Sequence, residues 1–191
     1  MAVKVLAFAG SLRKGSWNKK LIAFAAPLAR AAGAEVTLID LADLPMPVYD
    51  GDLEERDGVP ENARKLKSLM KSHDAFLIST PEYNSSIPGM LKNAFDWASR
   101  SEDGEKELEC FRGKVCGLLS ASPGALGGMR SLAATRSILE NIGTLVIPNQ
   151  VAVGKAHEAF ADDGSLKEQR LAAAVKAAAS RLVEVAGKLK A

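Results

Sequence analysis

Short apolar runs alternate with segments of helical periodicity along the chain. The apolar runs have the length and the β-branched content of buried strands, and most are bounded by glycine, proline or polar residues. They lie at residues 3–10, 34–40, 74–80, 114–122 and 144–153, with Pro148 interrupting the last. Each is too short to form a helix of ordinary length, so the pattern predicts five strands.

Helical segments follow each predicted strand. They lie at residues 18–32, 61–73, 90–100, 129–143 and 167–189. In the second of them, Ala63, Leu66, Leu69 and Met70 share one face, as in an amphipathic helix. Pro27 is expected to kink or shorten the first helix, and Gly143 to end the fourth. Residues 41–60 are rich in Pro, Gly and Asp and predict a long loop, which is either functional or wraps an edge.

The strict alternation of strand and helix predicts an α/β fold in a single domain spanning residues 1–191. Alternation of this kind forms a parallel sheet with helices on both faces, and right-handed crossovers restrict it to doubly wound forms. Ligands of such sheets bind beyond the carboxyl ends of the strands. Three loops are therefore expected to meet at one edge: residues 10–18, 81–88 and 122–128.

Composition excludes several classes of function. The chain is 47% hydrophobic and 25% charged with a formal net charge of +2, which is ordinary for a soluble protein and offers no bulk basicity for nucleic acid. Aromatic residues make up only 5%, too few for base-stacking platforms. No apolar run is long enough to span a bilayer, and the first residues lack the pattern of a signal peptide.

Cysteine and histidine usage indicates a cytoplasmic protein without a metal site. Cys110 and Cys116 are six residues apart, and we expect two reduced thiols, with Cys116 inside a strand. His73 and His157 have no neighbouring ligand pattern and are expected to be solvated loop residues.

The first loop, GSLRKGSWN, has the chemistry of a phosphate site. A helix N-terminus carries unpaired N–H groups and a partial positive charge. Ser11, Ser16 and Asn18 add side-chain donors, and Arg13 adds a guanidinium fork that matches phosphate oxygens. Ser16 or Asn18 could equally serve as a plain helix cap.

The absence of two nucleotide-binding motifs narrows the kind of phosphate ligand that this loop could bind. The dinucleotide pattern G-x-G-x-x-G is absent, and after Gly10 and Gly15 the positions of the P-loop Lys and Ser/Thr hold Ser16 and Trp17. A terminal monophosphate, as in flavin mononucleotide (FMN), fits better. FMN binders of this class have a flavodoxin-like five-stranded sheet of order 2-1-3-4-5.

The second loop, PEYNSSIPG, suits the ring of a flavin. Pro81 and Tyr83 can form a wall, and Asn84 and Ser85 can make polar contacts at the ring edge. Glu82 is as readily a capping or solvated acid as a ligand contact.

The third loop, SPGALGG, would let backbone approach the ring, because glycine has no Cβ. Ser122 could donate a hydrogen bond to the ring. Arg130, just beyond the loop, could reach an anionic ligand, lie free on the surface or contact a second subunit.

These three segments together resemble the NADPH-dependent FMN reductase family of flavodoxin-like proteins, whose members include quinone, chromate and azo-dye reductases. The most specific part is PEYN followed by LKNAFDW. The resemblance runs to about residue 153 and is weakest over residues 41–60 and in the C-terminal helix. It implies phosphate contacts from Ser11, Arg13, Ser16 and Asn18 with Trp17 alongside, and ring contacts from Pro81, Glu82, Tyr83, Asn84, Ser122 and Gly124.

The resemblance further implies a homodimer or homotetramer with residues 90–100 in the contact, which would place Trp97 at or beneath an interface unless it is a core residue. The flavin would accept a hydride from NADPH or NADH and pass two electrons to a quinone, a metal oxyanion, an azo compound or a similar acceptor. No general base is needed, so no catalytic residue is nominated. Arg13, Arg100 and Arg130 are candidates for the nucleotide 2′-phosphate.

Two other functions remain open. A flavodoxin-like electron carrier without turnover is the main alternative, although carriers tend to be acidic around the flavin and this first loop is basic. A module with a vestigial pocket would take up no FMN.

Overall fold

The computed structural model describes residues 1–190, so Ala191, the last residue of the expected domain, lies outside the described residues. The elements are β1 Val3–Ala9, α1 Trp17–Ala31, β2 Ala34–Ile39, the 3-10 helix η1 Leu41–Asp43, α2 Gly51–Asp57, α3 Glu61–Ser72, β3 Ala75–Ser79, α4 Gly89–Ala98, β4 Val115–Ala121, α5 Met129–Asn141, β5 Leu145–Val153, α6 Ala156–Ala159 and α7 Gln169–Lys190. The predicted strands and helices are all present, with ends that differ by a few residues.

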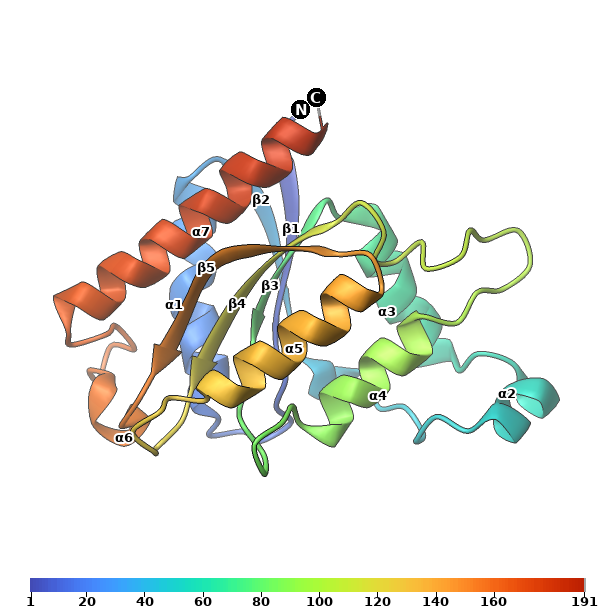
Figure 1. Ribbon diagram of the computed structural model, residues 1–191, viewed down its shortest axis with the longest axis horizontal. Coiled ribbons are helices and arrows are strands. Elements are labelled where there is room, and N and C mark those ends of the chain that lie inside the picture. Colours follow the sequence, from blue (N-terminus) through green and yellow to red (C-terminus); the bar gives the residue numbers. More distant parts are fainter. Residues whose placement is uncertain (191) are drawn as a thin grey trace.

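The five strands form one parallel sheet in the order β2-β1-β3-β4-β5, which confirms the predicted fold class. Helices α1 and α7 cover one face, and α3, α4 and α5 cover the other (Figure 1). All strands run the same way, so the three predicted loops leave the sheet at a single edge. The crossover from β1 to the outer β2 and back to β3 makes that edge the switch point where ligands bind in such sheets.

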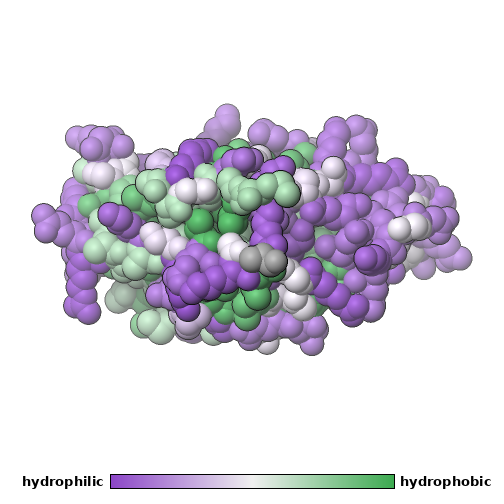
Figure 2. Space-filling view, turned by 90° about the horizontal axis from the view of Figure 1, so that it is seen from above, coloured by the Kyte–Doolittle hydropathy of each residue, from purple (hydrophilic) through white to green (hydrophobic). Residues whose placement is uncertain are grey.

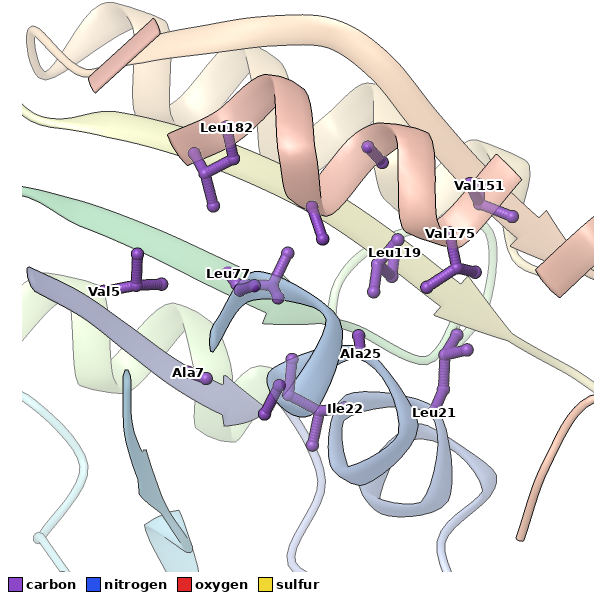
Figure 3. Close-up of a cluster of buried hydrophobic side chains, with 14 of the residues drawn as sticks. Val5, Ala7, Leu21, Ile22, Ala25, Leu77, Leu119, Val151, Val175 and Leu182 are labelled. Atoms are coloured by element: carbon purple, nitrogen blue, oxygen red, sulfur yellow. The ribbon is translucent and has the colours of Figure 1, made fainter. Parts of the chain in front are cut away.

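Strand β1 shows why the central strands read as continuous apolar runs. Its alternate residues Val5 and Ala7 face α1 and α7, whereas Leu6 and Phe8 face the helices of the other layer. All four are at most 1% exposed. Figure 3 shows the first of these two cores, in which side chains of α1 and α7 converge on the sheet. Burial on both faces requires apolar residues at every position, so this strand lacks the alternation of apolar and polar residues that is typical of a strand with one exposed face.

The long loop predicted at residues 41–60 is partly wrong, because this segment contains η1 and α2. Asp40 and Asp50 cap these two helices, each accepting a hydrogen bond from a backbone N–H two residues on. Short helices of three and seven residues have too few positions to show periodicity, so composition dominated the prediction. The expected shortening of α1 at Pro27 is also wrong, since the helix continues to Ala31.

Trp97 of α4 anchors the 41–60 segment. Its indole Nε1 donates to the Pro47 carbonyl at 2.8 Å, and its ring meets Tyr49 edge-on at a centroid distance of 5.0 Å. Arg100 binds the Glu54 carboxylate through Nε at 2.8 Å. Trp97 is 0% exposed, so it lies in the core of its own chain.

Pro148 breaks the ladder between β4 and β5 without ending the strand. The register shifts between Cys116, which pairs with Val146, and Leu118, which pairs with Gln150. The carbonyls freed near this bulge accept from Arg136, whose guanidinium donates to Val146 at 2.9 Å and to Ile147 at 2.7 Å.

A lysine holds the 101–113 connection to the body of the protein. Lys67 is 2% exposed and pairs with Glu102 at 3.0 Å and Glu105 at 2.6 Å. Glu105 also pairs with Lys71. Burial raises the pKa of Glu105, but these lysines outweigh that effect and lower it to about 2.

Both cysteines are buried free thiols, and Cys116 lies inside β4 as predicted. The prediction of a solvated loop is wrong for His73, which is 7% exposed. Its Nδ1 is 2.6 Å from the Leu69 carbonyl and its Nε2 is 2.8 Å from the Thr37 hydroxyl, so it joins α3 to β2. No helix within residues 1–190 has the length and apolarity to cross a membrane, and in that same range no cluster of His, Cys, Asp and Glu could hold a metal ion.

Candidate functional site

Asn18 connects the first loop to the two central strands. Its side-chain amide donates to the Ala121 carbonyl at 2.9 Å, and its Oδ1 accepts from the Ala121 N–H at 2.9 Å and from the Ser79 hydroxyl at 2.9 Å. Asn18 is 2% exposed. It therefore continues the hydrogen bonding of the sheet beyond the ends of β3 and β4, and fixes the start of α1 against both.

Ser16 is the N-cap of α1. Its Oγ accepts from the N–H groups of Asn18 at 3.2 Å and Lys19 at 3.4 Å, which leaves its own O–H free to donate. The capping alternative for Ser16 is thus confirmed, and it is compatible with binding an anion, because capping uses the lone pairs and anion binding uses the proton.

Unpaired donors gather around this cap. Within residues 1–190, the backbone N–H groups of residues 11–15 have no hydrogen-bond partner in the protein. The Ser11 hydroxyl also makes no hydrogen bond in that range; the residue is 3% exposed, and its oxygen still reaches solvent. Arg13 is exposed and forms no ion pair with a described residue. A cluster of amide, hydroxyl and guanidinium donors at a helix N-terminus has the composition that anions require.

Trp17 lies beside this cluster as the first residue of α1. Its ring stacks on Phe160 with a centroid distance of 5.9 Å and an interplanar angle of 9°, and the Lys20 ammonium lies 4.6 Å from the ring centroid. Phe160 follows α6, so this stack joins the first loop to the segment after β5.

The second loop is a tight hairpin. Tyr83 and Ser86 exchange two backbone hydrogen bonds, of 3.0 and 3.1 Å. Asn84 and Ser85 between them have φ values of 49° and 67°, the left-handed region that a two-residue type I′ turn requires. Asn tolerates this region better than most residues, and Ser does so less readily. The backbone at the tip is therefore held in a conformation of higher energy by its surroundings.

Hydroxyl groups hold the backbone that leads into this hairpin. Ser120 of β4 donates to the Thr80 carbonyl at 2.6 Å, and Ser131 of α5 donates to the Pro81 carbonyl at 2.8 Å. Ser131 also lies 3.2 Å from the Thr80 hydroxyl. These residues are buried, so the hydrogen bonds compete with little water and fix the position of the loop.

Glu82 pairs with Arg130 in the first turn of α5. Its Oε1 accepts from the Arg130 Nε at 2.6 Å, and its Oε2 accepts from the Arg130 backbone N–H at 3.1 Å. The Glu82 side chain is 9% exposed and that of Arg130 is 58% exposed. Burial raises the pKa of the Glu82 carboxyl, but the hydrogen bonds from Arg130 outweigh burial and hold that pKa below its usual value.

The glycines of the third loop serve two different purposes. A Cβ on Gly127 would lie 2.7 Å from the Gly154 nitrogen, and a Cβ on Gly128 would collide with the Ser120 hydroxyl. These two glycines allow close packing of backbone and strands. Gly124 has more room, and its N–H donates to the Ser122 Oγ at 3.3 Å.

A cavity of about 240 Å³ lies between the three loops. It is lined by Ser11, Arg13, Ser16, Trp17, Asn18, Pro81, Glu82, Tyr83, Ala121, Ser122 and Pro123. Most of the predicted site residues thus surround one space. Asn84, Ser85 and Gly124 do not line it, because they sit at exposed loop tips. Ala121 and Pro123 were missed, although their position at the end of β4 would have indicated them.

Larger hollows occur elsewhere, so size does not identify the site. One of about 370 Å³ lies near the amino ends of the strands and is lined only by the charged residues Lys71, Lys106, Glu107, Glu109, Arg112 and Lys114. Figure 2 views the molecule from this edge, and side chains toward the α2 end are mostly hydrophilic. The smaller cavity is distinguished by its place at the switch point and by its unpaired donors.

The donor set of this cavity fits the phosphate of FMN. A phosphate dianion needs several N–H and O–H donors and a positive charge, which the free amides, Ser11, Ser16 and Arg13 offer. Pro81, Tyr83 and Trp17 line the same cavity and can contact an apolar ring.

Comparison with known proteins found FMN reductases and quinone reductases similar to this chain. The family model described as NADPH-dependent FMN reductase matches residues 3–158. A quinone reductase of Escherichia coli is 36% identical over 146 residues, covering 76% of this chain and 73% of that protein. An NAD(P)H-dependent FMN reductase of Pseudomonas aeruginosa is 34% identical over 170 residues, covering 88% of this chain and 86% of its own length.

A solved structure is similar over nearly the whole chain. The flavoenzyme NAD(P)H:(acceptor) oxidoreductase FerB from Paracoccus denitrificans superposes with a TM-score of 0.82 at 32% identity, covering 98% of each chain. The likeness therefore includes the 41–60 segment and α7, where the sequence resemblance is weakest.

Proposed function

The chain belongs to the NADPH-dependent FMN reductase family, and from this premise we propose that it is an enzyme that uses NAD(P)H to reduce quinones through bound FMN. The observation that carries the proposal is the set of unpaired donors at the start of α1, inside a cavity at the switch point of the sheet. The redox chemistry that FMN supplies when bound is to accept a hydride from nicotinamide and to transfer two electrons to the acceptor.

Each loop has its own task in this proposal. The amides of the first loop, with Ser11, Ser16 and Arg13, bind the phosphate. Pro81 and Tyr83 contact the ring, and the backbone around Ser122 closes its other side, with Asn84, Ser85 and Gly124 at the outer edge. The hydroxyls that hold Thr80 and Pro81 keep these contacts in place without reorganisation when charge develops on the ligand.

Asn18 differs from the other phosphate contacts in this scheme. Both functional groups of its amide already bind Ala121 and Ser79, so a single amide hydrogen remains for a ligand. We assign it chiefly to positioning, because it ties the phosphate loop to the strands that carry the two ring loops.

The arginines differ in their availability to a nucleotide 2′-phosphate. Arg100 is bound to Glu54 and lies past the end of α4, about 15 Å along the helix from Gly89, the residue that follows the second loop. Arg130 is bound to Glu82. Arg13 is the arginine of these three without an ion pair in residues 1–190, and it serves the FMN phosphate. We therefore propose that this chain uses NADH and NADPH with similar efficiency.

Exposed apolar side chains lie on or next to the three loops that surround the cavity. Leu12, Leu126 and Met129 are each at least 50% exposed, and Tyr83 is 48% exposed. Such side chains suit an apolar acceptor such as a quinone better than a metal oxyanion, and azo compounds remain further acceptors to test. They also support assembly as a homodimer or homotetramer, which sedimentation velocity measures.

The buried free thiols support a cytoplasmic location.

Turnover with a quinone tests the proposal against the electron-carrier alternative. We expect the purified protein to bind FMN and to oxidise NAD(P)H when a quinone is present, faster than with chromate. Binding of FMN without such turnover would favour the carrier, and failure to bind FMN would refute both functions.

Arg13→Ala tests the phosphate assignment. Loss of a charged hydrogen-bond donor to phosphate weakens binding by about 1.5–3 kcal/mol, so FMN affinity should fall by roughly 10- to 100-fold. Arg170→Ala is the matched control, because Arg170 is an exposed arginine on α7. Equal FMN affinities for the two variants, measured by fluorescence quenching, would contradict the assignment.

A further inference from the structure

Glu82 is the most buried charged group that lines the cavity. Its side chain is 9% exposed, compared with 58% for its partner Arg130. A carboxylate in such surroundings is costly unless it is paired and hydrogen-bonded. Arg130 provides both, through its guanidinium and through its backbone N–H.

The pair also completes the N-terminus of α5. Gly128, the N-cap residue, has no side chain to accept from the first N–H groups, and the Glu82 carboxylate accepts from one of them instead. A guanidinium beside a helix N-terminus is electrostatically unfavourable by itself. The carboxylate therefore stabilises both the helix end and the arginine, and the arginine neutralises the carboxylate.

The neutralised carboxylate lies where its charge would act on a ring bound in the cavity. Glu82 lines the same cavity as Pro81 and Tyr83, the proposed ring contacts, and immediately precedes the hairpin. A negative charge there, without its counter-ion, disfavours the addition of electrons to a ring in the cavity. Water screens it only in part, because the Glu82 side chain is 9% exposed.

We propose that Arg130 is the internal counter-ion of Glu82 and that the pair sets how strongly the site prefers reduced over oxidised FMN. This inference rests on FMN binding in the cavity. Arg130 is in this view a positioning residue that acts through Glu82, without contact with the acceptor or the nicotinamide nucleotide.

Charge-removing variants of both partners test the inference. Arg130→Met removes the positive charge and keeps most of the side-chain length, and Glu82→Gln removes the negative charge and keeps the shape. The double variant removes both. Lys92→Met, which breaks the ion pair of Lys92 with Asp96 on α4, is the control for losing an ion pair outside the cavity. The measured quantity is the ratio of the dissociation constants of oxidised and reduced FMN, obtained from the midpoint potential of bound FMN.

The expected results have opposite signs for the two single variants. An uncompensated charge in a partly desolvated site should change the ratio by about tenfold, against reduced FMN in Arg130→Met and in its favour in Glu82→Gln. The double variant and Lys92→Met should lie within about threefold of the parent protein.

Two outcomes would overturn the inference. One is an unchanged ratio in both single variants while FMN still binds. The other is a double variant that departs from the parent at least as far as Arg130→Met, which would indicate that the pair acts only by holding the loop. If the parent protein binds no FMN, the proposed function fails instead, so the two failures are distinguishable.

Discussion

Gly128→Ala probes how tightly the third loop packs on the sheet. Two separate costs apply to this substitution. Gly128 has φ +89°, a region that an L-residue enters at a cost of about 1–2 kcal/mol. The new Cβ would also collide with the Ser120 hydroxyl and lie 3.0 Å from its Cβ.

The collision has a structural consequence, because Ser120 cannot move freely. Its hydroxyl donates to the Thr80 carbonyl at 2.6 Å inside the buried network that holds the hairpin. Overpacking of this kind costs about 1–3 kcal/mol. The sum predicts a loss of about 2–5 kcal/mol in the free energy of unfolding.

Two glycine controls separate these costs. Gly33 has φ +97° with nothing within 4 Å of its added Cβ, so Gly33→Ala measures the backbone cost alone. Gly15 likewise has open space, and its φ lies outside the left-handed region, so Gly15→Ala should be near neutral. Urea unfolding of the three variants gives the free energies.

A double-variant cycle tests the collision itself. In a Ser120→Ala background the hydroxyl is gone, so Gly128→Ala should cost at least about 1 kcal/mol less than in the parent protein. A loss for Gly128→Ala no greater than for Gly33→Ala, together with no coupling to Ser120, would refute the packing argument.

Three further perturbations follow from buried groups. Asn18→Ala should lower the free energy of unfolding by about 2–4 kcal/mol, because Ala121 and the Ser79 hydroxyl lose their partner; a loss below 1 kcal/mol in urea would contradict this role. Glu105 has a pKa near 2 in the folded protein against an ordinary 4.5, so its stabilising contribution is complete above pH 4.5 and is lost as the pH falls toward 2. The stability difference between the parent and Glu105→Gln should therefore shrink over that interval, and a constant difference would count against the lysine network. Burial raises the pKa of the Cys110 thiol to about 11, so the two cysteines should react with a disulfide reagent far more slowly in the native protein than in urea; equal rates would refute their burial.

Most of the architecture and the place of the site could be predicted from local patterns. An apolar run such as residues 3–10 indicates a buried strand, and the helical segment after it indicates a crossover connection. The order of the elements along the chain and the parallel pairing of the strands follow from these two local signals, without knowledge of distant contacts. The three loops were located because parallel strands bring their carboxyl ends to one edge. Their residue types, such as Ser11 and Arg13, already carry the chemistry of anion binding.

The partners of individual side chains were decided by the tertiary structure alone. Asn18 reads as a helix cap or a phosphate contact, yet its amide bonds to Ala121, which is 103 residues away. From its sequence position Glu82 could be a solvated acid or a ring contact, yet Arg130 in the first turn of α5 neutralises it. A hydrogen bond or ion pair depends on which atoms lie within about 3 Å, and residues far apart along the chain reach that distance only when the sheet has assembled. The sequence by itself therefore determined the fold and the chemistry gathered at its edge, and the folded chain determined which of those groups remain free to bind a ligand.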